Sequence, residues 1–291
     1  MSFQITTAFV EQFKAGFTQR VQQAGSKLRD SVRVESQGGK AAFYNFIGAT
    51  TVRERTTRHG DSPYIETPHT RRMCTLRDYD WGDYVDDQDK LRTMNDPTNE
   101  YVNAAAMSMG RKMDEIIIDA FEATVSTGEH GASTAAFAAD GGTTLVHAGV
   151  GMDLDKLIEA RMVLDGNEAS EGDDLCLVMG ASQIRDLLAL PQISSSDYAS
   201  VKALVKGEVD TFMGFKIIRV NESLLPYSGG NRTCYAWAKS KMLLALGSDI
   251  QAKITEREDK GFATYAYTSM SLGALRMQGE GVVAIECADA S

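Results

Sequence analysis

The amino-acid sequence predicts an α+β fold in which a long extended loop, a long helix and a mixed α/β region follow one another along 291 residues. Three observations favour this fold class. Residues 32–80 are rich in Thr, Val, Tyr, Phe and Arg and show no helical period. Apolar residues from Val102 to Ala120 keep a spacing of three to four. Beyond residue 150, short apolar runs alternate with helical segments.

The first segment has the period of an amphipathic helix. Phe9, Phe13 and Phe17 recur every four residues, which places them on one helix face, and Gly25 is a plausible end. Such a face packs on the protein's own core or, on a terminal segment, docks on a neighbouring molecule. The sequence leaves both interpretations open.

Residues 32–80 predict an extended excursion, a β-hairpin whose turn lies near Gly60–Pro63. The stretch RDYDWGDYVDDQDK then predicts a half-buried strand with an acidic margin. Asp96 followed by Pro97 indicates the start of a helix that runs to Thr124, about 40 Å at the usual rise per residue. Residues 128–150 read as a loop.

The remaining chain predicts a mixed α/β domain that closes in antiparallel strands. Its expected elements are a helix capped by Asp153, strands at LCLVMG, FKIIRV and YAWAKSKMLLAL, a helix over Ser182–Leu190, a turn at Asp259–Gly261 and a second hairpin around Gly279–Gly281.

Composition excludes several function classes. A hydrophobic content of 43% suits a packed core, yet no apolar run approaches the roughly 18 residues that span a bilayer. The four cysteines lie far apart without metal-ligand spacing, so we expect reduced, mostly buried thiols. A formal charge of −10 disfavours general nucleic-acid binding, which depends on neutralising phosphates.

Catalytic and cofactor motifs are weak or missing from the sequence. The adjacent trio His59, Asp61 and Ser62 cannot easily align a nucleophile with its base. A metal site built from His59 and His69 would support a metal-assisted hydrolase, but no recognised ligand spacing favours it. Phosphate-binding and dinucleotide motifs do not occur, so we expect no cofactor, no metal and no enzyme activity.

Two opposed charge blocks stand side by side. Residues 53–77 hold six arginines against three acidic residues, and residues 78–89 hold six aspartates and no basic residue. They either neutralise each other on neighbouring strands of one molecule or join one copy to the next, where repetition strengthens weak pairs. We favour the second, which assigns intersubunit contacts to Arg53, Arg55, Arg58, His59, Arg71 and Arg72 and to Asp83, Asp86, Asp87 and Asp89.

The order of these elements resembles the major capsid proteins of tailed bacteriophages with the HK97-type fold. GRKMDEIIIDAF is similar to the spine helix of the peripheral domain, and VMGASQIRDLLALPQ and GFKIIRVNESLLPYSGG to parts of the axial domain. SLGALRMQGEGVVAIEC resembles the closing hairpin of the peripheral domain.

The resemblance implies a division of the chain. It assigns an N-terminal arm to 1–35, with Phe9, Phe13 and Phe17 as neighbour contacts, and the extended loop to 36–80. The peripheral domain would comprise 81–128 and 250–291, and the axial domain 129–249. In that family the loop lies over an adjacent subunit and the axial domain converges on the pentamer or hexamer axis.

The resemblance also implies partners and a location. We expect a homo-oligomeric icosahedral shell in the virion, assembled in the host cytoplasm, that encloses double-stranded DNA without sequence-specific binding and contacts no membrane. Some relatives carry a scaffolding domain before the arm, which this sequence lacks, so a separate scaffolding protein and a portal are expected. Lys40 is the only lysine of the loop, which argues against covalent crosslinking. The alternative is an encapsulin-like nanocompartment with a protein cargo.

Overall fold

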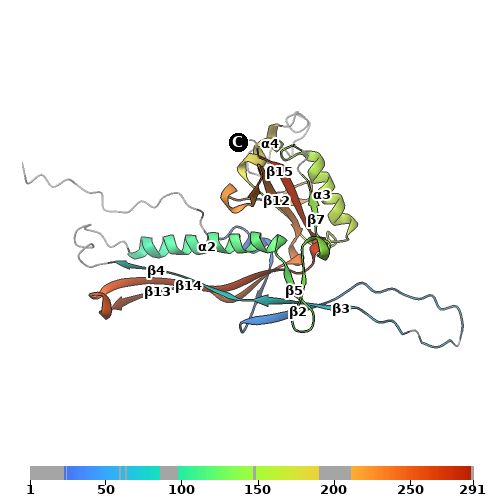
Figure 1. Ribbon diagram of the computed structural model, residues 1–291, viewed down its shortest axis with the longest axis horizontal. Helices are drawn as coiled ribbons and strands as arrows, with labels where there is room; N and C mark the ends of the chain where they lie inside the picture. The colour runs from blue at the N-terminus through green and yellow to red at the C-terminus, as the bar shows by residue number, and fades with distance from the viewer. Residues whose placement is uncertain are drawn as a thin grey trace, which may run out of the picture.

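The computed structural model describes residues 23, 25–58, 60–62, 64–85, 98–146, 149–189 and 211–289. They form an elongated base, an upright domain above one part of it, and a loop that projects from one end of the base (Figure 1). The expected contacts of Phe9, Phe13, Phe17, His59, Asp86, Asp87 and Asp89, and the helix start at Asp96, lie outside the described residues.

The base is a four-stranded sheet covered by one long helix. Its order is β1–β13–β14–β4, antiparallel except for the parallel pair β1 and β13, with bounds Arg33–Ser36 (β1), Met242–Arg257 (β13), Ala263–Arg276 (β14) and Arg77–Val85 (β4). Helix α2, Thr98–Glu122, lies along β14 (Figure 1). It buries Met109, Met113 and Ile117, as the period predicts.

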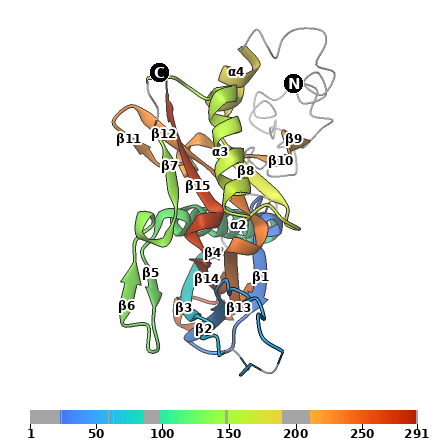
Figure 2. The same ribbon diagram turned by 90° about the vertical axis from the view of Figure 1, so that its right-hand side faces the viewer.

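The upright domain is built on a seven-stranded sheet in the order β7–β15–β12–β8–β10–β9, with β11 paired to β12. Figure 2 shows helix α3, Leu154–Gly166, lying against this sheet. The strand bounds are Thr143–Leu145 (β7), Leu175–Met179 (β8), Thr211–Phe212 (β9), Phe215–Arg219 (β10), Tyr227–Ser228 (β11), Asn231–Ala238 (β12) and Val282–Ala288 (β15), and helix α4 is Ala181–Ala189.

A third sheet forms the stem of the projecting loop. Its order is β2–β3–β5–β6, with all pairs antiparallel, and its bounds are Ala41–Ile47 (β2), His69–Thr75 (β3), Val125–Thr127 (β5) and Ser133–Ala135 (β6). The predicted hairpin therefore exists as the ladder β2–β3. Residues 48–68 between these strands form no ladder among the residues described.

Several sequence predictions are confirmed at the level of single elements. The side chain of Asp153 accepts the backbone N–H of Leu154 at the start of α3, at 2.5 Å. Gly261 adopts a left-handed conformation with φ of 65° at the predicted turn. All four cysteines are free and buried, and burial raises the pKa of Cys74 and of Cys176 to about 11.

Other predictions about the C-terminal half are wrong. The closing hairpin does not form, because β14 belongs to the base and β15 to the upright domain. YAWAKSKMLLAL likewise divides between β12 and β13, which lie in different sheets, and the boundary expected at residue 249 falls inside β13. Residues 128–150 are not simply a loop, since they contain β6, β7 and the 3-10 helix η3, Ala138–Asp140.

The base and the upright domain share one core. Phe121, near the end of α2, stacks on Tyr235 of β12 with ring centroids 4.7 Å apart, and it also contacts Trp237 at 4.8 Å. The indole N–H of Trp237 donates to the carbonyl of Ser31 at 2.9 Å. None of the described helices is long and apolar enough to cross a membrane.

Candidate functional site

The projecting loop, residues 48–68, is highly exposed. Figure 1 shows it running well beyond the ends of β2 and β3 before it turns back. The side chain of Val52 is 97% exposed and that of Tyr64 is 90% exposed. Apolar groups held this far from their own core are typical of surfaces that another protein covers.

The tip of the loop is held by its own backbone contacts. Arg55 Nε donates to the carbonyl of Thr57 at 3.1 Å, and a second nitrogen of the same guanidinium donates to the carbonyl of Arg58. Arg55 therefore stabilises the turn. The guanidinium groups of Arg53 and Arg58, by contrast, are exposed and form no hydrogen bond or ion pair within the described part of the chain.

The two arginines of the loop stem lie in different environments. Arg71 lies over the ring of Phe43 at 5.5 Å and donates to the carbonyl of Glu129 at 3.2 Å, near the surface. The expectation that Arg72 contacts another subunit is wrong, because its side chain is only 8% exposed and pairs with Asp140 of the same chain. Its charge is already satisfied inside the subunit.

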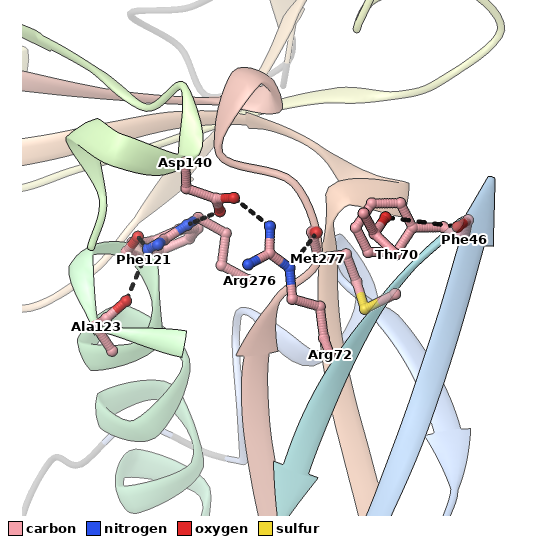
Figure 3. A network of polar contacts seen from close by, with 8 residues as sticks. All are labelled: Phe46, Thr70, Arg72, Phe121, Ala123, Asp140, Arg276 and Met277. Atoms are coloured by element: carbon pink, nitrogen blue, oxygen red, sulfur yellow. Dashed lines mark hydrogen bonds and ion pairs between the residues drawn. The ribbon is translucent and has the colours of Figure 1, made fainter. Parts of the chain in front are cut away.

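Arg72, Asp140 and Arg276 form a buried cluster, which we call the polar junction (Figure 3). Asp140 accepts hydrogen bonds from both guanidinium groups, and its distance to Arg276 Nε is 3.1 Å. Arg72 Nε also donates to the carbonyl of Met277 at 3.2 Å. One carboxylate thus joins the loop stem, the base and the 3-10 turn that leads into the upright domain.

Arg276 additionally closes the end of α2. Its Nη1 donates to the carbonyls of Phe121 at 2.5 Å and Ala123 at 3.0 Å, groups that have no partner within a helix terminus. Burial lowers the pKa of Arg276, and its hydrogen bond to Asp140 opposes that shift. The guanidinium also lies 5.1 Å from the ring centroid of Phe137. The polar junction therefore fixes where the long helix stops.

A second anchor holds the start of the described chain on α2. Asp114, fully buried in the helix, accepts from Ser26 Oγ at 2.5 Å and from the backbone N–H groups of Lys27 and Leu28 at 3.1 Å each. The chain crosses close to the helix here, because a Cβ added to Gly110 would overlap the backbone of Gly25. The segment that leads to the N-terminus therefore departs from a fixed point.

The predicted acidic strand is β4, at one edge of the base sheet. Tyr79 and Trp81 point toward the core, and Lys112 of α2 lies 5.8 Å from the Tyr79 ring. Asp78 and Asp80 are exposed on the other face, whereas Asp83 is half-buried and accepts the N–H of Tyr84 at 2.8 Å. Among described residues, no ion pair joins these aspartates to the arginines of 53–77, although the two charge blocks are adjacent in sequence.

The metal-site hypothesis receives no support from the described residues, which contain no group of three or more potential ligands. His69 opens β3 on the exposed stem, beside Asn45 and Arg71, and its proposed partner His59 lies outside the described residues.

Comparison with known proteins gives a consistent result. A family model described as phage capsid protein matches residues 5–289. No curated protein sequence matches the chain. Its structure is similar to a chain from Mycobacterium phage Che8, with a TM-score of 0.72, 16% identity, and coverage of 95% of this chain and 97% of that chain.

Two further structures agree. The capsid asymmetric unit of cyanophage Pam1 has a TM-score of 0.71 at 14% identity and covers 98% of both chains. The head structure of Helicobacter pylori bacteriophage KHP40 has a TM-score of 0.68 at 12% identity, covering 97% of this chain and 96% of that one. The predicted HK97-type fold is thereby confirmed.

Proposed function

Because this chain belongs to the phage capsid protein family and forms the icosahedral shell of a phage head, we propose that its projecting loop is the part of each subunit that holds a neighbouring copy. The carrying observation is the exposure of residues 48–68, whose apolar and charged side chains have so few contacts inside the subunit. Long loops without secondary structure in a compact protein are usually functional or disordered, and here Arg55 gives the tip a defined turn.

The family suggests roles for the other parts of the shell subunit. The upright domain, close to the expected axial domain of residues 129–249, would meet its copies at the pentamer or hexamer axis, and residues 1–35 would reach a neighbour as an arm. The anchor at Asp114 supports the second role, since it fixes where that segment leaves α2.

The shell would enclose double-stranded DNA without reading its sequence. A net charge of −10 supports this, because a negative wall does not bind the packaged phosphates tightly. A separate scaffolding protein and a portal would complete assembly in the host cytoplasm. Nucleic-acid content of isolated particles distinguishes this shell from a nanocompartment with protein cargo.

Charge reversal on the loop tests its role. We expect Arg53→Glu with Arg58→Glu to reduce the yield of shells seen by electron microscopy, while circular dichroism of the subunit stays unchanged because neither side chain contacts the core. The matched control is Arg53→Lys with Arg58→Lys, which keeps both charges. If the reversed variant assembles as well as this control, the loop does not hold the neighbour through its charges.

A further inference from the structure

The arm of the loop from Ala49 to Thr57 has a strand composition but no strand partner. Its sequence ATTVRERTT consists mainly of β-branched residues and alternating charges, which favour a sheet. The structure leaves it outside every ladder of the described residues, although it follows β2 directly. A local preference that the subunit does not satisfy points to a partner outside it.

An open sheet edge of the same length is present at the far end of the base. β4 is terminal in the order β1–β13–β14–β4, and within the described chain the backbone of Arg77–Val85 bonds only to β14 along its length. A strand of this length extends about 30 Å, and the arm extends almost as far. An unprotected edge of this length is a template for strand addition.

The two features lie at opposite ends of one molecule. Figure 1 shows the loop beyond β2 and β3 at one end of the base and the free end of β4 toward the other. A contact between different surfaces of identical subunits is heterologous, and it closes into a ring when the rotation allows. This placement makes a second copy of the chain the natural occupant of the β4 edge.

We propose that residues 49–57 of one subunit add as a further strand to the outer edge of β4 in a neighbouring subunit. This inference rests on the proposed function and specifies the receiving surface. Backbone hydrogen bonds would supply the contact, and the side chains on the two faces would set the register.

Charge selects one of the two possible side-chain alignments. On β4, Asp78 and Asp80 share the face that points away from α2, together with Tyr84, whose ring lies 4.6 Å from that of Tyr265. If Arg53 occupies this face, it meets two unpaired carboxylates and an aromatic ring.

The same alignment suits the other face. Val52 and Glu54 would then lie on the α2 side, where Trp81 offers an apolar surface and Lys112 a positive charge. The opposite alignment would place Glu54 beside Asp78 and Asp80, and like charges directly across a ladder are destabilising. The favoured register therefore pairs the odd-numbered residues of the arm with the even-numbered residues of β4.

A charge-swap cycle in the full-length chain tests the pairing. We expect Arg53→Glu and Asp80→Arg each to lower the yield of shells about tenfold, because each places like charges together. The double variant is expected to restore assembly. The matched control combines Arg53→Glu with Asp83→Arg, which changes the same strand on its other face and is expected not to restore it. Equal recovery in the control, or none in the Asp80 variant, overturns the alignment.

Hydrogen exchange separates this inference from the proposed function. Amides of residues 50–56 and of residues 78–84 are both expected to gain protection when unassembled subunits become shells. If the loop gains protection and β4 does not, for instance because the free part of β13 is protected instead, the strand addition is wrong and the loop still holds a neighbour. If neither segment gains protection, both proposals fail.

Discussion

Replacing Asp140 by alanine is expected to destabilise the subunit strongly. Arg276 is 0% exposed and Arg72 is 8% exposed at their side chains, so both cations would stay buried without a counter-charge. Two opposite charges about 4 Å apart interact by about 4 kcal/mol at the dielectric typical of protein sites. Removing one partner of a buried pair generally costs about 3–5 kcal/mol, because the remaining charge is uncompensated.

The measurement is urea unfolding of the dissociated subunit, followed by the fluorescence of its tryptophans, of which Trp237 is buried beside the end of α2. The expected loss is a third or more of the stability of a typical domain, which is about 5–15 kcal/mol. The matched control is Asp165→Ala, which breaks the 2.9 Å pair with Arg161 on exposed α3 and should cost under about 0.5 kcal/mol.

Arg72→Met provides a second variant in case the Asp140 variant does not fold. It leaves Asp140 paired with Arg276 and removes the donor to the carbonyl of Met277, so a smaller loss of about 1–3 kcal/mol is expected. Equal unfolding midpoints for Asp140→Ala and the Asp165→Ala control would show that the polar junction contributes no net stability, contrary to this reasoning.

Three further predictions concern single positions. Gly110→Ala is expected to destabilise the subunit by about 1–3 kcal/mol in thermal unfolding, since its Cβ would overlap the backbone of Gly25, whereas Gly166→Ala, with open space around it, should not; equal effects would contradict the close crossing. Met213→Asn should stabilise by about 0.5–1 kcal/mol, because Met213 and Gly214 form a two-residue turn with φ of 51° and 82°, which asparagine adopts more readily, and a lower melting temperature would refute this. Asp249→Asn should cost up to about 1 kcal/mol at pH 7 through loss of the pair with Arg29. The hydrogen bond from Arg29 holds the pKa of Asp249 below its ordinary value, so the contribution of the pair is present above that ordinary value and is lost as pH falls through the folded-state value; a difference between variant and wild type that persists in full at strongly acidic pH would exclude this origin.

The extent to which the sequence predicts this structure follows from the range of each signal. Helix α2 is predictable because Met109, Met113 and Ile117 repeat within a few turns, and β4 because Tyr79 and Trp81 alternate with aspartates. Sheet membership is not local, so nothing in the sequence of residues 263–288 reveals that β14 and β15 part into different sheets.

The polar junction escapes sequence prediction for the same reason. Asp140 is 68 residues from Arg72 and 136 from Arg276, and no motif connects them. The one available signal is Arg276 itself, a lone charge in the apolar stretch SLGALRM, because a buried charge requires a partner. Composition places Arg72 on the surface because five arginines crowd residues 53–72, and it does not distinguish the stem of a loop from its tip.

The burial of Arg72 bears on assembly as well as on stability. A loop that projects from a mobile stem would lose much conformational entropy each time it ordered on a neighbour. Here the stem ladder β2–β3 is joined through Arg72 to Asp140 and Met277, and the tip is closed by Arg55, so both ends of the arm are defined before contact. Because the same carboxylate binds Arg276 at the end of α2, the direction of the loop is tied to the direction of the base. Each subunit thus presents its arm at an angle set by its own core, which lowers the entropic cost of every contact repeated around the shell.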